Sequence, residues 1–537
     1  MTYSERERRL LSRYFSEVDR RDHADVYLVH GLPPEVAATL NGVYSRSSLS
    51  MRDNFLQRLT KGLAETGRTL DDFEIGDAAP DGLSTVLADK SGQFLKTYAV
   101  DHGHNSLREG SVLHFAVENV SQLVTRFLQR ERRCSFEESS TRYVSFRSEG
   151  HWRDPDVAAD PEAAAAYESV LQSTFTLYER LTDALLAHLR RTRPQRQDEK
   201  EAPYLRAIKA EAFDAARYLL TPALYTKWGM VVDARTLSDM VVELSSHPLA
   251  EFRIVGEQLK AQGDRVVRSL LLHARPNAFL AAQHRDHPPA ARRLGTAPRV
   301  TGVGTPSVTL LRHDRDLDAR LLASLLYESA SLPFADCVAK VTAMPRAERE
   351  QALQSLVAAR GPRDALPAGI EGADPFEFEV VVDFGAYRDI GRHRKGFQQQ
   401  QRLTTAHGYV VPPLLVEAGL DGEFRDTLDR AAELQQVVER RFPLAAGYVT
   451  PFAFLQRVRI QFEPRQLAYF IELRSGPEGH FAYRRVAIDM WRHVQQVSPL
   501  FASLIRVQEG EAFLGRMQAE QGADERRLRR MREAGDH

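Results

Sequence analysis

Apolar positions recur along this chain with two periods, one typical of strands and one typical of helices, and together they predict a mixed α+β fold. In the first half, the run SVLHFAVENV (111–120) predicts a strand. A helix is expected directly after it, because the next apolar residues share one helical face: Val120, Leu123, Val124, Phe127 and Leu128. This helix leads into a cluster of arginines: Arg130, Arg132 and Arg133.

The second half repeats this order of elements. A strand-like run, FEFEVVVDF (376–384), precedes a short helical stretch and then an Arg-His-Arg triplet at 392–394. Each half later carries a run with helical spacing around one arginine, 234–244 in the first half and 464–474 in the second. The shared order of strand, helix, arginine cluster and second helix predicts an ancient tandem duplication of one mixed helix and sheet domain.

Composition places the boundaries of these repeats. The first repeat is expected over 1–275 and begins with a charged N-terminal helix. Residues 276–306 are rich in Pro, Gly, Arg and Ala, which indicates a linker. The second repeat is expected over 307–510, and a charged C-terminal tail follows over 511–537. The four glutamines at 398–401 are expected on a solvated turn of helix, and the alternative is that they line a pocket for a base.

The bulk composition restricts the classes of partner. The chain has 537 residues, of which 43% are hydrophobic and 27% charged, as in proteins with a substantial core. Its 72 basic and 73 acidic residues give a formal net charge of -1, so we expect neither nucleic acid nor a membrane as partner. Two cysteines predict no disulfide framework, and the charged start does not resemble a signal peptide, so a cytoplasmic location is expected. The histidines are scattered, and no metal site is expected.

The segment 130–143 (RERRCSFEESSTRY) concentrates arginines, serines and carboxylates where the chain is expected to turn irregular after a helix. Guanidinium forks bind phosphate through paired hydrogen bonds, and hydroxyl and backbone N–H groups complete such a shell. The segment therefore suits a nucleotide phosphate. The alternative is a surface network of salt bridges, since runs of charge are usually solvated. Cys134, within the segment, is expected to be a packing residue.

The same segment resembles the signature of the flavin-dependent thymidylate synthases, R-H-R-x-x-S-x-N-E-x-S-x-R-Y. Seven residues stand in register: Arg130, Arg132, Ser135, Glu138, Ser140, Arg142 and Tyr143. His104 resembles a family histidine before the signature, and Arg217, in AARYLLTPALYTKW (215–228), resembles the family's phosphate-binding arginine. Arg235 resembles the arginine that lies against the flavin nucleotide. The resemblance extends over about half of the chain, 26–275.

The first half also departs from the family pattern. Several family positions hold other residues here: Glu131 replaces a histidine, Glu137 an asparagine, Phe127 a glutamine and Gly110 a histidine. Near 243–244, where the family places the uracil-polarising arginine, this half has Glu243 and Leu244 instead. We therefore expect the first half to be a poor synthase by itself.

The second half resembles the family where the first half does not. Arg392, His393 and Arg394 restore the R-H-R triplet, while Arg465 and Arg474 resemble the flavin arginine and the uracil-polarising arginine. No counterpart of the phosphate-binding arginine appears near 445–450. Family members are homotetramers with active sites between subunits, so the resemblance implies a homodimer that mimics a tetramer. The alternative is that the second half has decayed into a scaffold.

These observations lead to the hypothesis of a composite site. It would combine residues from both halves: Ser140, Arg142 and Arg217 from the first, with Arg392 and Arg474 from the second. Changing either Arg142 or Arg474 to alanine is then expected to abolish nucleotide binding.

The resemblance implies conversion of dUMP to dTMP, with FAD as cofactor and NADPH and methylenetetrahydrofolate as co-substrates. Arg474 and Ser140 would be catalytic. Substrate-binding residues would be Arg130, Glu138, Ser140, Arg142, Arg217, Arg392 and Arg474. Cofactor-binding residues would be His104, Arg130, Arg132, Glu138, Arg235, Arg392, His393, Arg394 and Arg465. Two alternatives remain: the same fold modifying another pyrimidine nucleotide, or a non-catalytic protein that binds flavin and nucleotide.

Overall fold

The structure of the chain is a computed structural model. The described residues are 3–19, 25–45, 47–65, 67–72, 91–92, 94–96, 105–141, 146, 150–195, 197, 200–361, 364–477, 479–510, 522 and 526. The chain divides into two compact units, each considered by itself. Unit one comprises Met1–Glu118, Arg133–Glu138 and Lys227–Thr296; unit two comprises Asn119–Arg132, Ser139–Thr226 and Ala297–His537. The expected C-terminal tail lies almost entirely outside the described residues.

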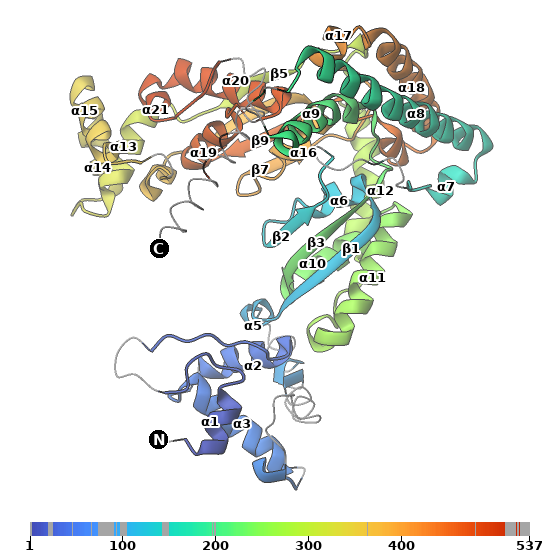
Figure 1. The fold of residues 1–537 in the computed structure, drawn as a ribbon. Coiled ribbons are helices and arrows are strands. Elements are labelled where there is room, and N and C mark those ends of the chain that lie inside the picture. Colours follow the sequence, from blue (N-terminus) through green and yellow to red (C-terminus); the bar gives the residue numbers. More distant parts are fainter. Residues whose placement is uncertain are drawn as a thin grey trace. The chain divides into compact units, whose positions relative to one another are not determined.

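Unit one begins with three helices around a small apolar core (Figure 1). Helix α1 (Glu5–Leu11) starts in a capping box, in which Ser4 and Glu7 each bond the other's backbone N–H. Buried side chains join it to α2 (Pro34–Tyr44) and α3 (Met51–Glu65): Leu10, Phe15, Leu40, Phe55 and Leu59. Of the charged helix expected at the N-terminus, the described residues show α1.

A three-stranded sheet follows, in the order β1-β3-β2. Its strands are β1 (Val112–Ser121), β3 (Tyr225–Asp233) and β2 (Cys134–Glu138). Strands β2 and β3 are antiparallel, with Cys134 opposite Val232. The other helical elements of unit one are η1 (Leu70–Asp72), α5 (Ser106–Glu109), α10 (Ala234–Ser245), α11 (Ala250–Val267), η4 (Arg268–Leu270) and α12 (Ala278–Arg292).

Asp233 is both the last residue of β3 and the N-cap of α10. Its Oδ1 accepts a hydrogen bond from the Thr236 N–H at 2.9 Å, which satisfies one of the free donors of the first helical turn. Apolar residues of α10 then lie buried at helical spacing, including Leu237, Val241 and Leu244. The helix expected over 234–244 is therefore present.

Unit two is built on a four-stranded sheet in the order β5-β6-β9-β7. The strands are β5 (Ser307–Arg312), β6 (Phe376–Asp383), β9 (Leu455–Phe462) and β7 (Phe397–Gln400). Strand β6 runs antiparallel to β9 along its whole length, from Phe376 opposite Phe462 to Asp383 opposite Leu455. The glutamines expected on a helical turn therefore pair along β9 instead, from Phe397 opposite Gln461 to Gln400 opposite Val458.

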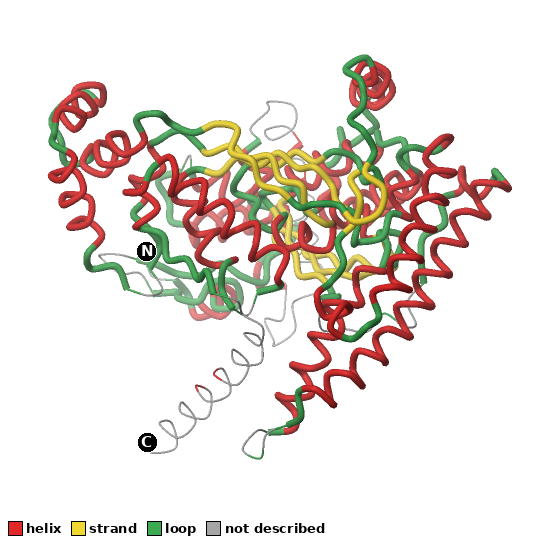
Figure 2. Tube along the Cα trace, turned by 90° about the horizontal axis from the view of Figure 1, so that it is seen from above, coloured by secondary structure: helices red, strands yellow, loops and turns green. Residues whose placement is uncertain are grey.

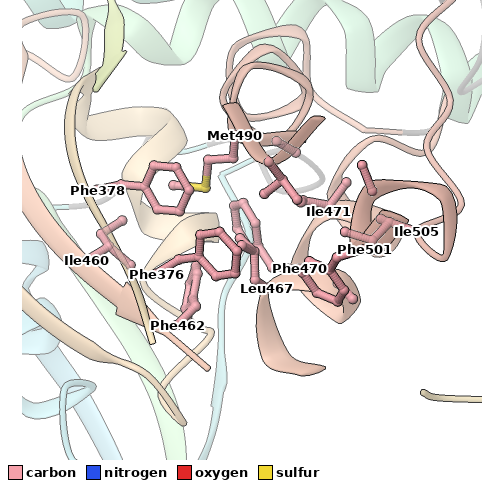
Figure 3. Packing of buried hydrophobic residues seen from close by; sticks show 14 of the residues in the cluster. Phe376, Phe378, Ile460, Phe462, Leu467, Phe470, Ile471, Met490, Phe501 and Ile505 are labelled. Atoms are coloured by element: carbon pink, nitrogen blue, oxygen red, sulfur yellow. The ribbon is translucent and has the colours of Figure 1, made fainter. Parts of the chain in front are cut away.

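One face of this sheet is covered by helices α19 (Pro464–Arg474), α20 (Phe481–Val497) and α21 (Pro499–Ser503). Figure 3 shows the resulting core, in which aromatic rings from β6 and β9 meet aliphatic and aromatic side chains of the helices. The labelled members include Phe376, Phe378, Ile460, Phe462, Leu467, Phe470, Ile471, Met490, Phe501 and Ile505. Burying this much apolar surface fixes the register of β6 and β9, because a slip by one residue would turn these side chains to the other face.

Unit two also contains two long helices, α8 (Pro161–Thr192) and α18 (Asp421–Arg441), which pack along each other (Figure 1). Figure 2 distinguishes these helices from the strands by colour. The remaining elements of the unit are α6 (Gln122–Leu128), α7 (Pro155–Ala158), α9 (Glu201–Ala216), η3 (Arg217–Leu219), β4 (Val300–Val303), α13 (Leu317–Tyr327), α14 (Phe334–Ala343), α15 (Arg346–Val357), η5 (Ala368–Gly372), α16 (Phe384–Ile390), β8 (His407–Tyr409), α17 (Pro413–Glu417) and η6 (Ala445–Val449).

The two repeats share their topology. The order β1, α6, β2 in the first repeat corresponds to β6, α16, β7 in the second, and β3, α10 corresponds to β9, α19. The sheet order β1-β3-β2 then matches β6-β9-β7, with β5 as an added edge strand. The mixed fold and its repetition therefore agree with the sequence prediction.

A further local expectation was wrong. The stretch at 134–138 is the strand β2 rather than irregular chain, because its backbone pairs with β3. Residues 276–306 include helix α12 and strand β4, and Pro288 and Pro289 lie inside α12. Cys134 is buried with its sulfur 3.7 Å from the Met240 sulfur, as expected for a packing residue.

Candidate functional site

The candidate site lies in unit two and begins at Arg217, the first residue of η3. This side chain is 2% exposed, so its charge is almost fully removed from water. Its Nη2 donates to the Gly385 carbonyl at 3.3 Å and lies 4.0 Å from Asp389 Oδ2. Its Nε has no hydrogen-bond partner among the described residues. A buried guanidinium with an unused donor is costly, which favours an anionic ligand beside it.

Asp383 lies next to Arg217 and starts helix α16. Its Oδ1 accepts a hydrogen bond from the Ala386 N–H at 2.6 Å, as an N-cap does. Burial raises the pKa of this carboxyl to about 6, although the Ala386 N–H and the Arg217 guanidinium both favour the charged form. Burial and the nearby Asp383 also raise the pKa of the Tyr218 hydroxyl. The carboxyl of Asp383 and the guanidinium of Arg217 are therefore buried side by side.

Arg474, the last residue of α19, approaches the same helix. Its Nη2 donates to the Asp389 carbonyl at 2.9 Å, and its Nε donates to His393 Nε2 at 2.8 Å. A guanidinium has donors and no acceptor, so Nε2 of His393 must carry the lone pair and Nδ1 the proton. Burial, with the Arg474 charge, lowers the pKa of His393 to about 3. His393 is therefore a neutral acceptor that orients Arg474.

His480 packs against Tyr218. It caps α20, because its Nδ1 accepts from the Ala482 N–H at 3.3 Å. Its Nε2 therefore carries the proton and donates to the Asp214 carbonyl at 3.3 Å. The imidazole ring stacks on Tyr218 with centroids 5.7 Å apart. These contacts join the end of α9 to the start of α20.

Arg388 links the second repeat to the motif of the first. It is buried in α16, and its Nη1 donates to the Thr141 hydroxyl at 2.9 Å. Arg126 of α6 is also buried and donates to the Arg388 carbonyl at 3.0 Å. Both arginines stand five residues after the N-cap of their helix, Ser121 in α6 and Asp383 in α16. This shared position is a sequence signal for Arg388, which lies outside the family motif.

The comparison with protein families decides the identity of the fold. The model of the family described as thymidylate synthase complementing protein matches two segments, 64–267 and 323–500. Together these segments cover more than half of the chain. The chain belongs to the thymidylate synthase complementing protein family.

Full-length relatives of this chain include two UPF0159 proteins. That of Chlamydia pneumoniae is 29% identical over 515 residues, covering 93% of this chain and 94% of the relative. That of Chlamydia muridarum is 28% identical over 540 residues, covering 96% and 98%. The flavin-dependent thymidylate synthase of Geobacter sulfurreducens is 32% identical over 83 residues, or 15% of this chain and 36% of that protein.

A solved structure was also found: the UMP/dUMP methylase PolB from Streptomyces cacaoi, bound with 5-Br dUMP. It is 14% identical and covers 38% of this chain and 96% of its own, with a TM-score of 0.31.

The two segments matched by the family model contribute different parts of the site. Arg217 lies in the first segment, and Asp389 and Arg474 lie in the second. In unit two, Arg217 and Arg474 both contact Asp389, one at the side chain and the other at the carbonyl. The structure thus brings together two of the five residues of the hypothetical composite site.

The other motif residues of unit two lie nearer the surface. Arg130 is exposed, with its guanidinium 4.0 Å from the centre of the Phe127 ring. Arg132 and Arg392 are also exposed. Arg394 is half-buried and donates to the Glu131 carbonyl. These side chains are all more exposed than Arg217.

Some predicted residues take part in other contacts or cannot be placed. Arg465 donates to the Leu366 carbonyl at 2.7 Å and lies 3.5 Å from Glu371, so it ties α19 to η5. Ser140 is half-buried in unit two, whereas Glu138 ends β2 in unit one. Arg142 and His104 lie outside the described residues.

Unit one carries a separate charged cluster around Glu109. Its carboxylate accepts from Arg235 at 2.6 Å and lies 2.7 Å from Arg133 Nη2. These two guanidinium groups lower the pKa of Glu109. All three side chains are partly exposed. The predicted flavin arginine Arg235 is therefore paired with a carboxylate in this structure.

Neither a metal site nor a membrane span emerges from the described parts of the chain. No group of three or more His, Cys, Asp or Glu residues there is arranged to bind a metal ion. The helices in those parts are all too short or too polar to cross a bilayer.

Proposed function

We propose that this chain is a flavin-dependent enzyme that converts dUMP to dTMP, with methylenetetrahydrofolate as carbon donor and NADPH as reductant. The observation that carries the proposal is the convergence of Arg217 and Arg474 on Asp389. These two arginines come from different repeats, and the family resemblance assigns one to the phosphate and the other to the uracil. A site that needs both repeats explains why each repeat retains different parts of the motif.

Arg217 is suited to hold the nucleotide phosphate. The side chain is buried, and its Nε has no hydrogen-bond partner among the described residues. A charge-assisted hydrogen bond from a desolvated guanidinium to a phosphate oxygen is stronger than one between neutral groups. Ser140 and Arg142, from the motif of the same repeat, are proposed as further phosphate ligands.

Arg474 is suited to act on the pyrimidine. Its Nε and Nη2 already donate to His393 and to the Asp389 carbonyl, which fixes the plane of the guanidinium. A fixed positive charge near a pyrimidine carbonyl draws electron density towards that oxygen, stabilises the enolate-like charge and makes C5 nucleophilic. The C5 carbon would then bond to the methylene carbon of the folate while one methylene–nitrogen bond of the folate breaks and its electron pair goes to that nitrogen. The C5 proton would leave to water.

The exposed arginines fit a dinucleotide diphosphate. Arg130, Arg132 and Arg392 are exposed, and Arg394 follows Arg392 closely in the sequence. We propose that these residues and His393 hold FAD. The chemistry that FAD would supply there, when bound and reduced by NADPH, is the hydride that completes the methyl group. We further propose a homodimer, in which four repeats reproduce the four subunits of the family's tetramers.

The test compares single arginine variants of the full chain. Purified protein is expected to be yellow, to bleach with NADPH, and to release tritium from C5-tritiated dUMP. Arg217→Ala and Arg474→Ala should each abolish dUMP binding in calorimetry. Arg430→Ala, which removes an exposed arginine of α18 paired with Glu433, is the matched control and should bind normally. Loss of binding in Arg217→Ala alone would show that the second repeat does not contribute.

A second candidate function is supported by the Asp389 carboxylate, which lies 4.0 Å from Arg217. A carboxylate beside the phosphate position disfavours an unmodified dianion, as do Glu131 and Glu137 in the motif. The chain would then modify another pyrimidine nucleotide, or bind flavin and nucleotide without catalysis. Binding of dUMP without tritium release would favour this candidate.

A further inference from the structure

Gln398 of strand β7 uses both ends of its side-chain amide inside unit two. Its Oε1 accepts a hydrogen bond from the Tyr387 hydroxyl at 2.8 Å, and its Nε2 donates to the His393 carbonyl at 3.0 Å. Tyr387 is buried in α16, and Gln398 is half-buried. A hydroxyl on one side and a carbonyl on the other fix which end of the amide is the oxygen. The glutamine therefore ties the main chain of His393 to α16.

His393 is held at three points, and the third is Arg474. Its N–H donates to the Ile390 carbonyl at 3.0 Å, its carbonyl accepts from Gln398, and its Nε2 accepts from Arg474 Nε at 2.8 Å. Its ring meets the Phe470 ring edge to face, with centroids 4.9 Å apart. Because the imidazole turns only about the bonds that join it to the main chain, a fixed main chain limits where Nε2 can lie. The position of the Arg474 guanidinium therefore depends on Gln398.

The first repeat provides an internal comparison. In the second repeat, Gln398 of β7 pairs with Ile460 of β9. At the corresponding register of the first repeat, Phe136 of β2 pairs with Met230 of β3. Three further positions differ, with the residue of the first repeat given first: Thr125 and Tyr387, Glu131 and His393, and Leu244 and Arg474. The glutamine thus stands in the repeat that has the histidine and the arginine, and the other repeat lacks all three.

We propose that Gln398 is a positioning residue for Arg474, acting through His393, and that it supports the chemical step without contacting the nucleotide. The proposal rests on the proposed function, in which Arg474 polarises the pyrimidine carbonyl. Charge stabilisation of this kind depends on where the donor lies relative to the atom that becomes negative. Without the Gln398 bonds, the main chain of His393 and the guanidinium are free to shift, so Arg474 still meets the pyrimidine but stabilises the enolate-like charge less.

This role differs from that of a glutamine that lines a pocket for a base. A base-binding amide keeps a donor or an acceptor for the ligand, whereas both ends of the Gln398 amide are already bonded within the chain. Loss of a base contact weakens nucleotide binding, and loss of a positioning contact slows the reaction of the bound nucleotide. The two roles therefore separate in the kinetics.

The first experiment compares tritium release and nucleotide binding in the full chain. Gln398→Met keeps the length of the side chain and removes both hydrogen bonds. We expect the kcat for tritium release from C5-tritiated dUMP to fall about tenfold, with the calorimetric Kd for dUMP within about twofold of the wild-type value. Gln399→Ala, which removes an exposed glutamine of the same strand, is the matched control and should leave both values unchanged.

The second experiment tests the route through His393 without relying on activity. Nitrogen-15 NMR of histidine-labelled protein reports Nε2 of His393, assigned by its absence from the spectrum of His393→Gln. In Gln398→Met this resonance should move towards that of a ring nitrogen without a hydrogen bond, which a mere loss of stability in thermal unfolding does not cause. Gln398→Glu keeps the acceptor for Tyr387 and loses the donor to His393. It should show the same change, and it replaces Gln398→Met if that variant does not fold.

The outcomes separate this inference from the proposed function. A lower kcat with an unmoved His393 resonance, or a moved resonance with full kcat, would overturn the positioning role. A Kd for dUMP raised more than tenfold with an unmoved resonance would overturn it as well, because Gln398 would then bind the base. If the wild-type chain neither binds dUMP nor releases tritium, the proposed function fails. The His393 resonance then decides alone whether Gln398 positions Arg474, and an unmoved resonance would overturn it.

Discussion

His393 is neutral because of the group that it faces. Arg474 Nε donates to its Nε2, so a proton on that nitrogen would place two donors against each other. Burial and the Arg474 charge act in the same direction, and the pKa falls from 6.5 to about 3. The tautomer with the proton on Nδ1 therefore allows the hydrogen bond that orients Arg474.

This charge state predicts a distinct pH response. We expect His393 to remain neutral, with its proton on Nδ1, down to pH 5 in nitrogen-15 NMR spectra of labelled protein. In the unfolded chain the histidine takes up a proton near pH 6.5, so unfolding is favoured as the pH falls from about 6.5 towards 3. His393→Gln, which keeps an acceptor for Arg474, should remove this part of the acid sensitivity. An imidazolium spectrum for His393 at pH 6 would contradict the assignment.

The pKa of Asp383 predicts the opposite dependence of stability on pH. Its pKa rises on folding from 3.8 to about 6, so the folded chain binds the proton more tightly than the unfolded chain does. Its contribution to stability is fully present below pH 3.8 and is lost as the pH rises to about 6. Relative to the wild type, Asp383→Asn should therefore gain about 2 kcal/mol of unfolding free energy between pH 4 and pH 7.

Denaturant unfolding across that pH range measures this difference. Asparagine keeps the cap on α16, and any change in its contacts with Arg217 adds an offset that does not vary with pH. Asp383→Ser, which is also a neutral cap, is the control and should show the same slope. A difference between variant and wild type that stays flat with pH would show that Asp383 has an ordinary pKa.

At the scale of elements, α16 needs a small residue where it passes Arg217. A Cβ at Gly385 would lie 3.9 Å from Arg217 Nε and 3.2 Å from Asp383 Oδ1. Gly385→Ala therefore adds a methyl group with a tight but tolerable contact, and we expect dUMP affinity to change less than threefold. Gly385→Leu should displace the guanidinium, reduce dUMP affinity more than tenfold and destabilise the fold by about 1–3 kcal/mol.

Calorimetry and thermal unfolding of this pair of variants separate the two effects. If Gly385→Leu bound dUMP as the wild type does, Arg217 would not be the phosphate ligand. If Gly385→Ala already abolished dUMP binding, the loss would come from the tight contact of the new Cβ with Asp383 and not from displacement of Arg217.

The sequence predicted elements whose signals are local. Periodicity located β1, β6, α10 and α19, because each has a continuous apolar face. It misplaced Gln398, Gln399 and Gln400, because a polar edge strand is specified by its partner β9, far along the chain. Proline and composition suggested a linker at 276–306, yet helix α12 forms there.

The sequence identified only those residues of the candidate site that have a local signal. Arg217 and Arg474 stand in recognisable motifs, but their shared contact, Asp389, does not. Asp383 had a local signal, since an Asp between an apolar run and a helix is a typical N-cap. Asp389 had none, because its importance arises from tertiary packing of η3 and α19 against α16.

At the scale of the whole chain, the repeats meet in unit two through matching hydrogen bonds. The Ala223 N–H donates to the Tyr448 carbonyl at 2.8 Å, and the Ala453 N–H donates to the Tyr218 carbonyl at 3.0 Å. Likewise, Leu123 N–H bonds to the Pro222 carbonyl at 3.3 Å, as Gly385 N–H bonds to the Phe452 carbonyl at 3.2 Å. Within unit two, these segments of the two repeats are thus paired in an approximately two-fold manner.

This arrangement identifies the position that corresponds to the candidate site in the other repeat. Ala446-Gly447-Tyr448 in η6 takes the place of Ala216-Arg217-Tyr218 in η3. A Cβ at Gly447 would lie 3.7 Å from Leu403 and 3.8 Å from Leu123, and Leu123 takes the place of Gly385. The arginine and the glycine have therefore become a glycine and a leucine, and apolar packing fills the second position.

We therefore predict one dUMP bound per chain, although each chain contains two repeats. Calorimetric titration of protein of known concentration measures this ratio directly. Gly447→Arg should not create a second site, because the new side chain would meet Leu123 and Leu403 and no counterpart of Asp389 stands there, Phe127 being at that position. A ratio near two in the wild type would mean that a nucleotide can bind without a buried arginine. The assignment of the phosphate to Arg217 would then lose its basis, since the two positions share their backbone and differ at this side chain.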